Sequence, residues 1–155
     1  MTKNNLSLPT NCNLRRATAK DIWQIRKLVF GAKLDPTQLR PEQFWVVESE
    51  EKIVACGQLR NFEGAQELGS LVVASPWRGR GLGTFLSNHL IEEATKPLYL
   101  ECLGKNLEKF YTGLGFVAIS WEELPQSLKF KFGLSSMGKK LLKIPVTLME
   151  HRGGS

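Results

Sequence analysis

The stretch from residue 68 to residue 86 constrains the fold most, because it joins a strand-like run to a helix-like run through arginines and glycines. Residues 68–74 are apolar and rich in β-branched side chains, which favours a strand. Leu82, Phe85, Leu86 and Leu90 then recur at helical spacing. Glycines let a backbone approach a ligand closely, and the free N–H groups at a helix start attract anions. The stretch therefore predicts a strand, a phosphate-binding turn and a helix.

The glycine pattern of this turn narrows the choice of phosphate ligand. It lacks the Lys-Ser/Thr pair of a Walker-type P-loop, which argues against a nucleoside triphosphatase. Its spacing is Gly79-x-Gly81-x-Gly83, not G-x-G-x-x-G, and no acidic residue ends a second strand about 20 positions later, as dinucleotide binding requires. The pattern present is Arg-x-x-Gly-x-Gly, at Arg78, Gly81 and Gly83. The alternative is a plain connection, in which the two arginines would have no packing purpose.

Together with its flanking strand and helix, this pattern resembles the acetyl-CoA-binding motif of the GNAT-type N-acetyltransferase superfamily. The segment 110–116, Phe-Tyr-Thr-Gly-Leu-Gly-Phe, resembles the same superfamily's Phe-Tyr-x-x-x-Gly-Phe motif. The resemblance implies an α/β (α+β) acetyltransferase fold with a mixed central sheet of six to seven strands and about four helices. It also implies acetyl-CoA as co-substrate and direct transfer to a primary amine in a ternary complex. The alternative from another class is a non-catalytic acyl-CoA-binding or regulatory module of the same fold.

The resemblance assigns acetyl-CoA binding to a strand end and the loop after it. It implies that the N–H of Leu71 polarises the thioester carbonyl and that the N–H of Val73 binds the pantetheine arm. An unpaired N–H inside a strand needs a bulge, and residues 69–70 are the expected position. We expect the side chains of Leu71 and Val73 to lie in the core. The expected acetyl-CoA-binding residues are Leu71, Val73, Arg78, Gly79, Arg80, Gly81, Leu82, Gly83 and Thr84.

Two residues are the catalytic candidates. In the family, the tyrosine at the place of Tyr111 donates a proton to the departing thiolate, and a phenol with a pKa of ~10 is protonated at neutral pH. The alternative is a half-buried tyrosine whose hydroxyl only finds a hydrogen-bond partner. Glu67 lies where some members carry their glutamate base, and regular alternation would put it on the same face as Leu71. An exposed strand glutamate or a water chain is the alternative, with Glu101 and Tyr99 as further candidates.

The three cysteines bear on compartment and on covalent chemistry. Cys12, Cys56 and Cys102 are too scattered for a disulfide framework, and no ligand pattern indicates a metal. We therefore expect a reduced, cytoplasmic protein without a metal. A covalent role for Cys102 is disfavoured because no histidine is placed to activate it, so we expect a small buried apolar residue there. His89, on the helix after the loop, is expected to be structural.

Length, charge and hydropathy set the remaining expectations. The 155 residues predict a flexible N-terminal arm at 1–11 and a single domain at 12–151. The net charge of +6 suits an anionic ligand or an acidic acceptor and requires no nucleic acid. No apolar run approaches the ~20 residues of a membrane span. The resemblance implies an amine acceptor of unspecified identity as partner, and the protein is expected to be a monomer or homodimer.

The element order follows from the same patterns. Strands are expected at 14–18, 44–48, 52–60, 66–74, 98–103, 116–121 and 144–150, and helices at 22–31, 81–95 and 107–114. Residues 125–142 are expected to be irregular. The lysine-rich segment 129–143 begins in this region. It is interpreted as a solvated loop, with a basic lip that gathers an acidic acceptor, or a nucleic-acid or membrane-surface patch, as alternatives. Trp77 is expected beside the cofactor, and the other three tryptophans in the core.

Overall fold

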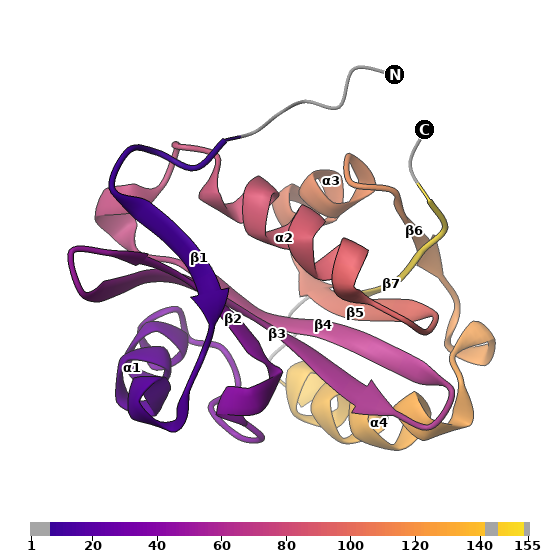
Figure 1. Ribbon diagram of the computed structural model, residues 1–155. Helices are drawn as coiled ribbons and strands as arrows, with labels where there is room; N and C mark the ends of the chain where they lie inside the picture. The colour runs from indigo at the N-terminus through magenta and orange to yellow at the C-terminus, as the bar shows by residue number, and fades with distance from the viewer. Residues whose placement is uncertain (1–6, 142–145, 154–155) are drawn as a thin grey trace. The chain divides into compact units, whose positions relative to one another are not determined.

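The computed structural model describes residues 7–141 and 146–153, and for residues 134–141 it describes the backbone alone. Its strands form one mixed seven-stranded sheet in the order β1-β2-β3-β4-β5-β7-β6 (Figure 1). The expected mixed α/β architecture is thereby confirmed. The strands are β1 Cys12–Arg16, β2 Phe44–Ser49, β3 Lys52–Phe62, β4 Ala65–Val73, β5 Leu98–Leu103, β6 Phe116–Ile119 and β7 Val146–His151. The α-helices of the described part are α1 Ile22–Gly31, α2 Leu82–Glu93, α3 Lys105–Thr112 and α4 Gln126–Leu141.

The chain divides into two compact units, one formed by residues 1–59 and 69–93 and the other by residues 60–68 and 94–155. None of the helices that the structure describes is long and apolar enough to cross a membrane.

In the first unit, β1, β2 and β3 pair antiparallel, with α1 and α2 on opposite faces (Figure 1). On the α1 face, Ile25 and Val29 pack in a buried cluster with Val46, Cys56 and Val72. The other face is closed by α2 over a glycine of β3. A Cβ atom built on Gly57 would lie 2.7 Å from Leu90 Cδ1 and 3.2 Å from Leu71 Cδ1, so the close approach of α2 depends on glycine at this position.

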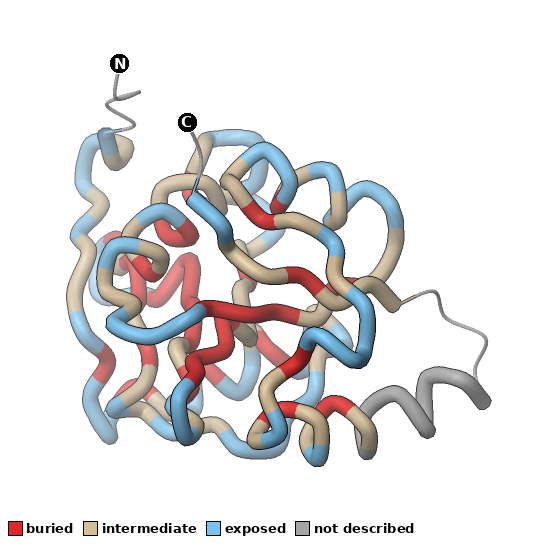
Figure 2. The backbone as a smooth tube through the Cα atoms, turned by 90° about the vertical axis from the view of Figure 1, so that its right-hand side faces the viewer, coloured by how far each residue is buried: buried red, intermediate tan, exposed pale blue. Residues whose placement is uncertain are grey.

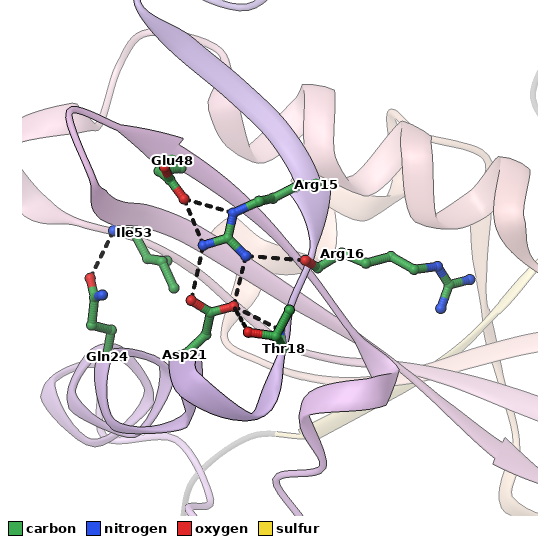
Figure 3. Close-up of polar contacts among 7 residues, drawn as sticks. All are labelled: Arg15, Arg16, Thr18, Asp21, Gln24, Glu48 and Ile53. Carbon is green, nitrogen blue, oxygen red and sulfur yellow. Dashed lines mark hydrogen bonds and ion pairs between the residues drawn. The ribbon is translucent and has the colours of Figure 1, made fainter.

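A partly buried charge network lies at the start of α1 (Figure 3). The Arg15 guanidinium donates to both carboxylate oxygens of Asp21, at 2.7 and 2.9 Å, and its Nε donates to Glu48 at 2.6 Å. The Thr18 N–H donates to Asp21 at 2.7 Å, and the two residues form a capping box in the turn that leads into α1. Arg15 holds the pKa of Asp21 at about 2, below its usual 3.8, although burial opposes this shift.

In the second unit, the start of β4 pairs parallel with β5, and β7 pairs antiparallel with both β5 and β6. Helices α3 and α4 cover opposite faces of these strands (Figure 1). On the α4 face, Leu124, Leu128 and Phe132 pack with Ala65 and Tyr99. Leu100, Cys102 and Met149 are buried on the α3 face, where the Cys102 and Met149 sulfur atoms lie 3.9 Å apart.

The expectation that residues 125–142 are irregular is wrong, because the chain forms α4 there. Leu124, Leu128 and Phe132 recur every four residues and are buried. In Figure 2, buried positions alternate with half-buried and exposed ones in the described part of this helix. Glycines at 133 and 138 lower the intrinsic helix propensity, each by about 1 kcal/mol relative to alanine. Packing of this apolar stripe outweighs that cost. Lys139, Lys140 and Lys143 of the lysine-rich segment lie outside the described side chains.

Two of the tryptophans expected in the core are on the surface instead. The side chain of Trp23 is 73% exposed and that of Trp121 is 39% exposed. Each still has a partner: the Arg26 guanidinium lies over the Trp23 ring at 5.0 Å, and the Trp121 ring lies over Gly133. Trp45 is half-buried, with its ring 4.2 Å from that of His89.

Candidate functional site

The expected irregularity in β4 is located at Ser70. Its φ of 51° lies in the left-handed region, where a residue with a Cβ is strained, and it interrupts the extended backbone of the strand. The regular alternation that placed Glu67 and Leu71 on one face therefore does not hold through this point. Val72 is the buried residue of this strand end, whereas Leu71 and Val73 are only half-buried. The expectation that both of their side chains lie in the core is wrong.

The loop between β4 and α2 uses glycine where the backbone requires it. Gly79 and Gly81 have φ values of 77° and 81°, a region open to glycine at little cost. The N–H of Phe85 donates to the Gly81 carbonyl at 3.0 Å and closes the first turn of α2. The N–H groups of Leu82, Gly83 and Thr84 stand before this bond, where a helix offers them no acceptor. The loop therefore presents a row of backbone donors at the positive end of α2.

Both loop arginines are exposed but held in place. The Arg80 guanidinium lies over the Trp77 ring, 4.6 Å from its centroid. Arg78 donates from Nε to the carbonyl of Val73 at 3.1 Å. Arg78 also lines a cavity of about 630 Å³ within the first unit, next to α1 and the β2–β3 turn, where Lys27 and Lys52 are the other cationic residues. The loop thus combines preset backbone donors with two positioned positive charges.

In the second unit, Tyr111 is buried at the end of α3, with 7% of its surface exposed. Its ring contacts those of Phe110 and Phe116, at centroid distances of 5.0 and 5.7 Å. Burial raises the pKa of Tyr111 well above its ordinary value of 10, and nearby Cys102 raises it further. The phenol is therefore protonated at all physiological pH values and is available as a proton donor.

Glu67 is buried, not an exposed strand glutamate, with 4% of its surface accessible. Its Oε1 atom pairs with the Arg60 guanidinium at 3.1 Å and with the Lys131 ammonium group of α4. Sequence reasoning missed both partners, because they come from β3 and from a segment expected to be irregular. Glu67 pairs in register with Tyr99, which lies on the α4 face, so Glu67 and Tyr111 lie on opposite faces of the strands of this unit.

Cys102 and Tyr99, two further titratable residues of this unit, are buried. Burial raises the pKa of the Cys102 thiol to about 11, with a contribution from Glu108. A neutral thiol is a poor nucleophile, which fits the expected role as a small buried side chain. Burial also raises the pKa of Tyr99, and the charge of Glu150 acts in the same direction. The structure thus brings Glu67 together with Arg60 and Lys131, and Tyr111 together with Cys102.

The part of the chain that holds the candidate residues matches a known protein family. A family model described as an acetyltransferase (GNAT) domain matches residues 40–118, which include β4, the glycine loop and the segment 110–116. This range covers Glu67, Tyr111 and all nine residues expected to bind acetyl-CoA.

Solved structures share the fold at low sequence identity. N-acetylglutamate synthase from Neisseria gonorrhoeae, complexed with coenzyme A and N-acetyl-glutamate, matches with a TM-score of 0.73 and 20% identity, over 95% of this chain and 37% of its own. This chain therefore spans well under half of that relative. Rv2747 from Mycobacterium tuberculosis, in complex with CoA, matches with a TM-score of 0.66 and 21% identity, over 88% of this chain and 97% of its own. An acyl-CoA N-acyltransferase from Pseudomonas aeruginosa matches with a TM-score of 0.62 and 18% identity, over 90% and 97%.

Proposed function

Because the chain belongs to the GNAT acetyltransferase family, we propose that it transfers an acetyl group from acetyl-CoA directly to a primary amine in a ternary complex. The observation that carries this proposal is the loop of residues 78–84, where two left-handed glycines precede the first turn of α2. Backbone N–H groups at a helix start suit a pyrophosphate, and the positioned arginines add positive charge. Two of the structural relatives were solved with coenzyme A bound, which supports the same assignment.

In this proposal the donor is held by backbone groups of the first unit. The loop N–H groups from Arg80 to Thr84 and the Thr84 hydroxyl bind the pyrophosphate, and the N–H of Val73 binds the pantetheine arm. The N–H of Leu71 donates to the thioester carbonyl oxygen, which becomes an oxyanion when the amine attacks. Losing one such donor typically raises the barrier by about 3 kcal/mol. The left-handed Ser70 supports this role, because it interrupts the strand just before Leu71.

Proton transfer is assigned to the two candidates of the second unit. The neutral amine forms a bond to the carbonyl carbon, and the tetrahedral intermediate then collapses by breaking the carbon–sulfur bond. Tyr111 gives its proton to the departing thiolate, which leaves as free coenzyme A. Glu67 lies on the face of these strands opposite Tyr111, so we assign it the proton that the amine nitrogen loses, taken directly or through a water, while Tyr111 serves the thiolate. Tyr111 and Glu67 then return to their starting protonation states by exchange with solvent. The two ion pairs of Glu67 within the described part of the chain use Oε1, so we assign this proton to Oε2.

The proposal is tested by isothermal titration with acetyl-CoA, followed by a thiol-release assay against pooled primary amines. We expect binding at a single site and thiol release with at least one pool, and the active pool defines the class of acceptor. Binding without release against any amine pool would favour the non-catalytic acyl-CoA-binding module. Absence of binding would refute the assignment of the loop.

A pair of glycine variants makes the titration specific to the loop. Gly81→Val places a β-branched side chain at a φ of 81° and is expected to abolish acetyl-CoA binding. Gly64→Val imposes a similar backbone penalty at a φ of 69° in the β3–β4 turn, where a Cβ meets no atom within 4 Å. This control is expected to bind acetyl-CoA as the wild type does. Equal affinity in both variants would contradict the proposal.

A further inference from the structure

A glutamine side chain is fully buried in the middle of β3, in the first unit. Gln58 has no exposed surface, yet all of its side-chain hydrogen bonds go to groups outside β3. Its Nε2 donates to the Gln38 carbonyl at 2.8 Å and to Gln43 Oε1 at 2.9 Å. Its Oε1 accepts from the Ser70 hydroxyl at 3.2 Å. Burying an amide is favourable only when its donors and acceptors are satisfied, so the arrangement of these partners is specific.

Two of these partners share an unusual backbone conformation. Ser70 has a φ of 51° and Gln38 a φ of 59°, and neither is a glycine. The left-handed region is costly for a residue with a Cβ, and within a strand, as at Ser70, surrounding contacts must hold the residue there. Ser70 is held a second time, since its carbonyl accepts from the Cys56 thiol at 3.5 Å. The Gln58 amide therefore joins two strained positions, one in the 33–43 segment and one in β4.

We propose that Gln58 is a positioning residue that fixes the backbone N–H of Leu71. By accepting from Ser70 Oγ, the Gln58 amide keeps Ser70 left-handed, and this conformation sets the direction of the next N–H along β4. Because Gln58 Nε2 also donates to Gln38 and Gln43, the same amide links the direction of the Leu71 N–H to the segment of residues 33–43. This inference rests on the proposed function, in which the Leu71 N–H binds the thioester carbonyl. Catalytic donors need placement to a fraction of an ångström, and a 1 Å displacement can lower a rate by about 100-fold.

The test starts with Gln58→Met, which keeps the length of the side chain and removes its hydrogen bonds. We expect kcat to fall by about 10- to 100-fold, with the affinity for acetyl-CoA and its KM unchanged, because the pyrophosphate loop is untouched. We also expect hydrogen exchange of the Leu71 amide to accelerate. This second readout requires no activity, so it separates the inference from the proposed function. Unchanged exchange together with unchanged kcat would overturn the inference.

Variants of Ser70 in the Gln58→Met background test whether the backbone conformation of Ser70 causes the loss of kcat. In the Gln58→Met background, Ser70→Gly is expected to recover most of kcat, because glycine adopts a φ of 51° without strain. Ser70→Ala also lacks the hydroxyl but keeps the Cβ, so it is expected to recover nothing. Equal rescue by both substitutions, or by neither, would overturn the conformational link.

Two further outcomes remain decisive. If Gln58→Met fails to fold, the single variants answer the same question. Ser70→Ala is then expected to lose kcat and Ser70→Gly to retain it, and the reverse would overturn the inference. If the wild type binds no acetyl-CoA, the proposed function fails, and the exchange of the Leu71 amide alone decides whether Gln58 sets this part of β4.

Discussion

The buried carboxylate of Asp21 gives a stability prediction whose size follows from the structure. Asp21 is 5% exposed and accepts from both the Arg15 guanidinium and the Thr18 N–H. Asp21→Asn removes the negative charge and keeps the shape of the side chain. Arg15 retains Glu48 as a partner, so the variant is expected to fold with reduced stability.

The size of the loss follows from the pKa of Asp21, which is held at about 2, below its usual 3.8. Because one pKa unit corresponds to about 1.4 kcal/mol, the ionised carboxylate contributes about 2 to 3 kcal/mol to the free energy of unfolding at pH 7. The folded-state pKa lies below the unfolded one, so this contribution is fully present above pH 3.8 and is lost as the pH falls through 2. About half of it remains at pH 3.

The assay is urea unfolding of the wild type and of Asp21→Asn at pH 7, 5 and 3. Because other acidic groups titrate alike in both proteins, the difference between them isolates Asp21. We expect a difference of about 2 to 3 kcal/mol at pH 7 and 5, and about half as much at pH 3. Glu42→Gln, an exposed carboxylate in the same unit, serves as control and is expected to stay within about 0.5 kcal/mol of the wild type. A difference below 0.5 kcal/mol at pH 7, or one independent of pH, would refute the reasoning.

The remaining predictions concern the second unit. Tyr111→Phe is expected to lower kcat by about 100-fold with the affinity for acetyl-CoA unchanged, measured by thiol release and titration, and an unchanged kcat removes Tyr111 from the mechanism. Since burial raises the pKa of Tyr111, the wild-type rate should show no loss from phenol ionisation up to pH 10. Cys102→Ala is expected to keep kcat within about threefold, because its thiol has a pKa of about 11 and is neutral. Inactivity of that variant in a folded protein would instead indicate covalent catalysis.

The sequence best predicted the elements whose signals lie within a few consecutive residues. The run of apolar residues before Gly104 predicted a strand at Leu98–Leu103, which is the extent of β5. The helix expected at residues 22–31 is α1, because the capping box of Thr18 and Asp21 just before it and the glycine at its end act within one turn. The loop of residues 78–83 was predicted as well, because both of its left-handed positions, Gly79 and Gly81, are glycines.

Features that depend on contacts between residues far apart in the sequence could not be predicted from the sequence. Helix α4 was missed because its glycines and serines lower helix propensity, while its stability comes from packing Leu128 and Phe132 against Ala65 and Tyr99. The charge partners of Glu67 were missed for the same reason, since Lys131 lies 64 positions away along the chain. Pairings at such separation leave no periodic signal in a single sequence.

Strand β4 shows that a sequence motif identifies only part of the proposed acetyl-transfer site. This strand contributes residues 65–68 to one unit and residues 69–73 to the other. The roles proposed for its residues follow different physical rules. Leu71 is proposed to act through a backbone N–H, which any side chain at this position leaves in place, whereas Glu67 is proposed to act through its carboxylate. The conformation that directs the N–H is set not by a glycine but by a serine that a buried glutamine holds. A backbone geometry enforced by side chains can therefore be found only by tracing hydrogen bonds, and the Gln58 and Ser70 variants test whether catalysis depends on it.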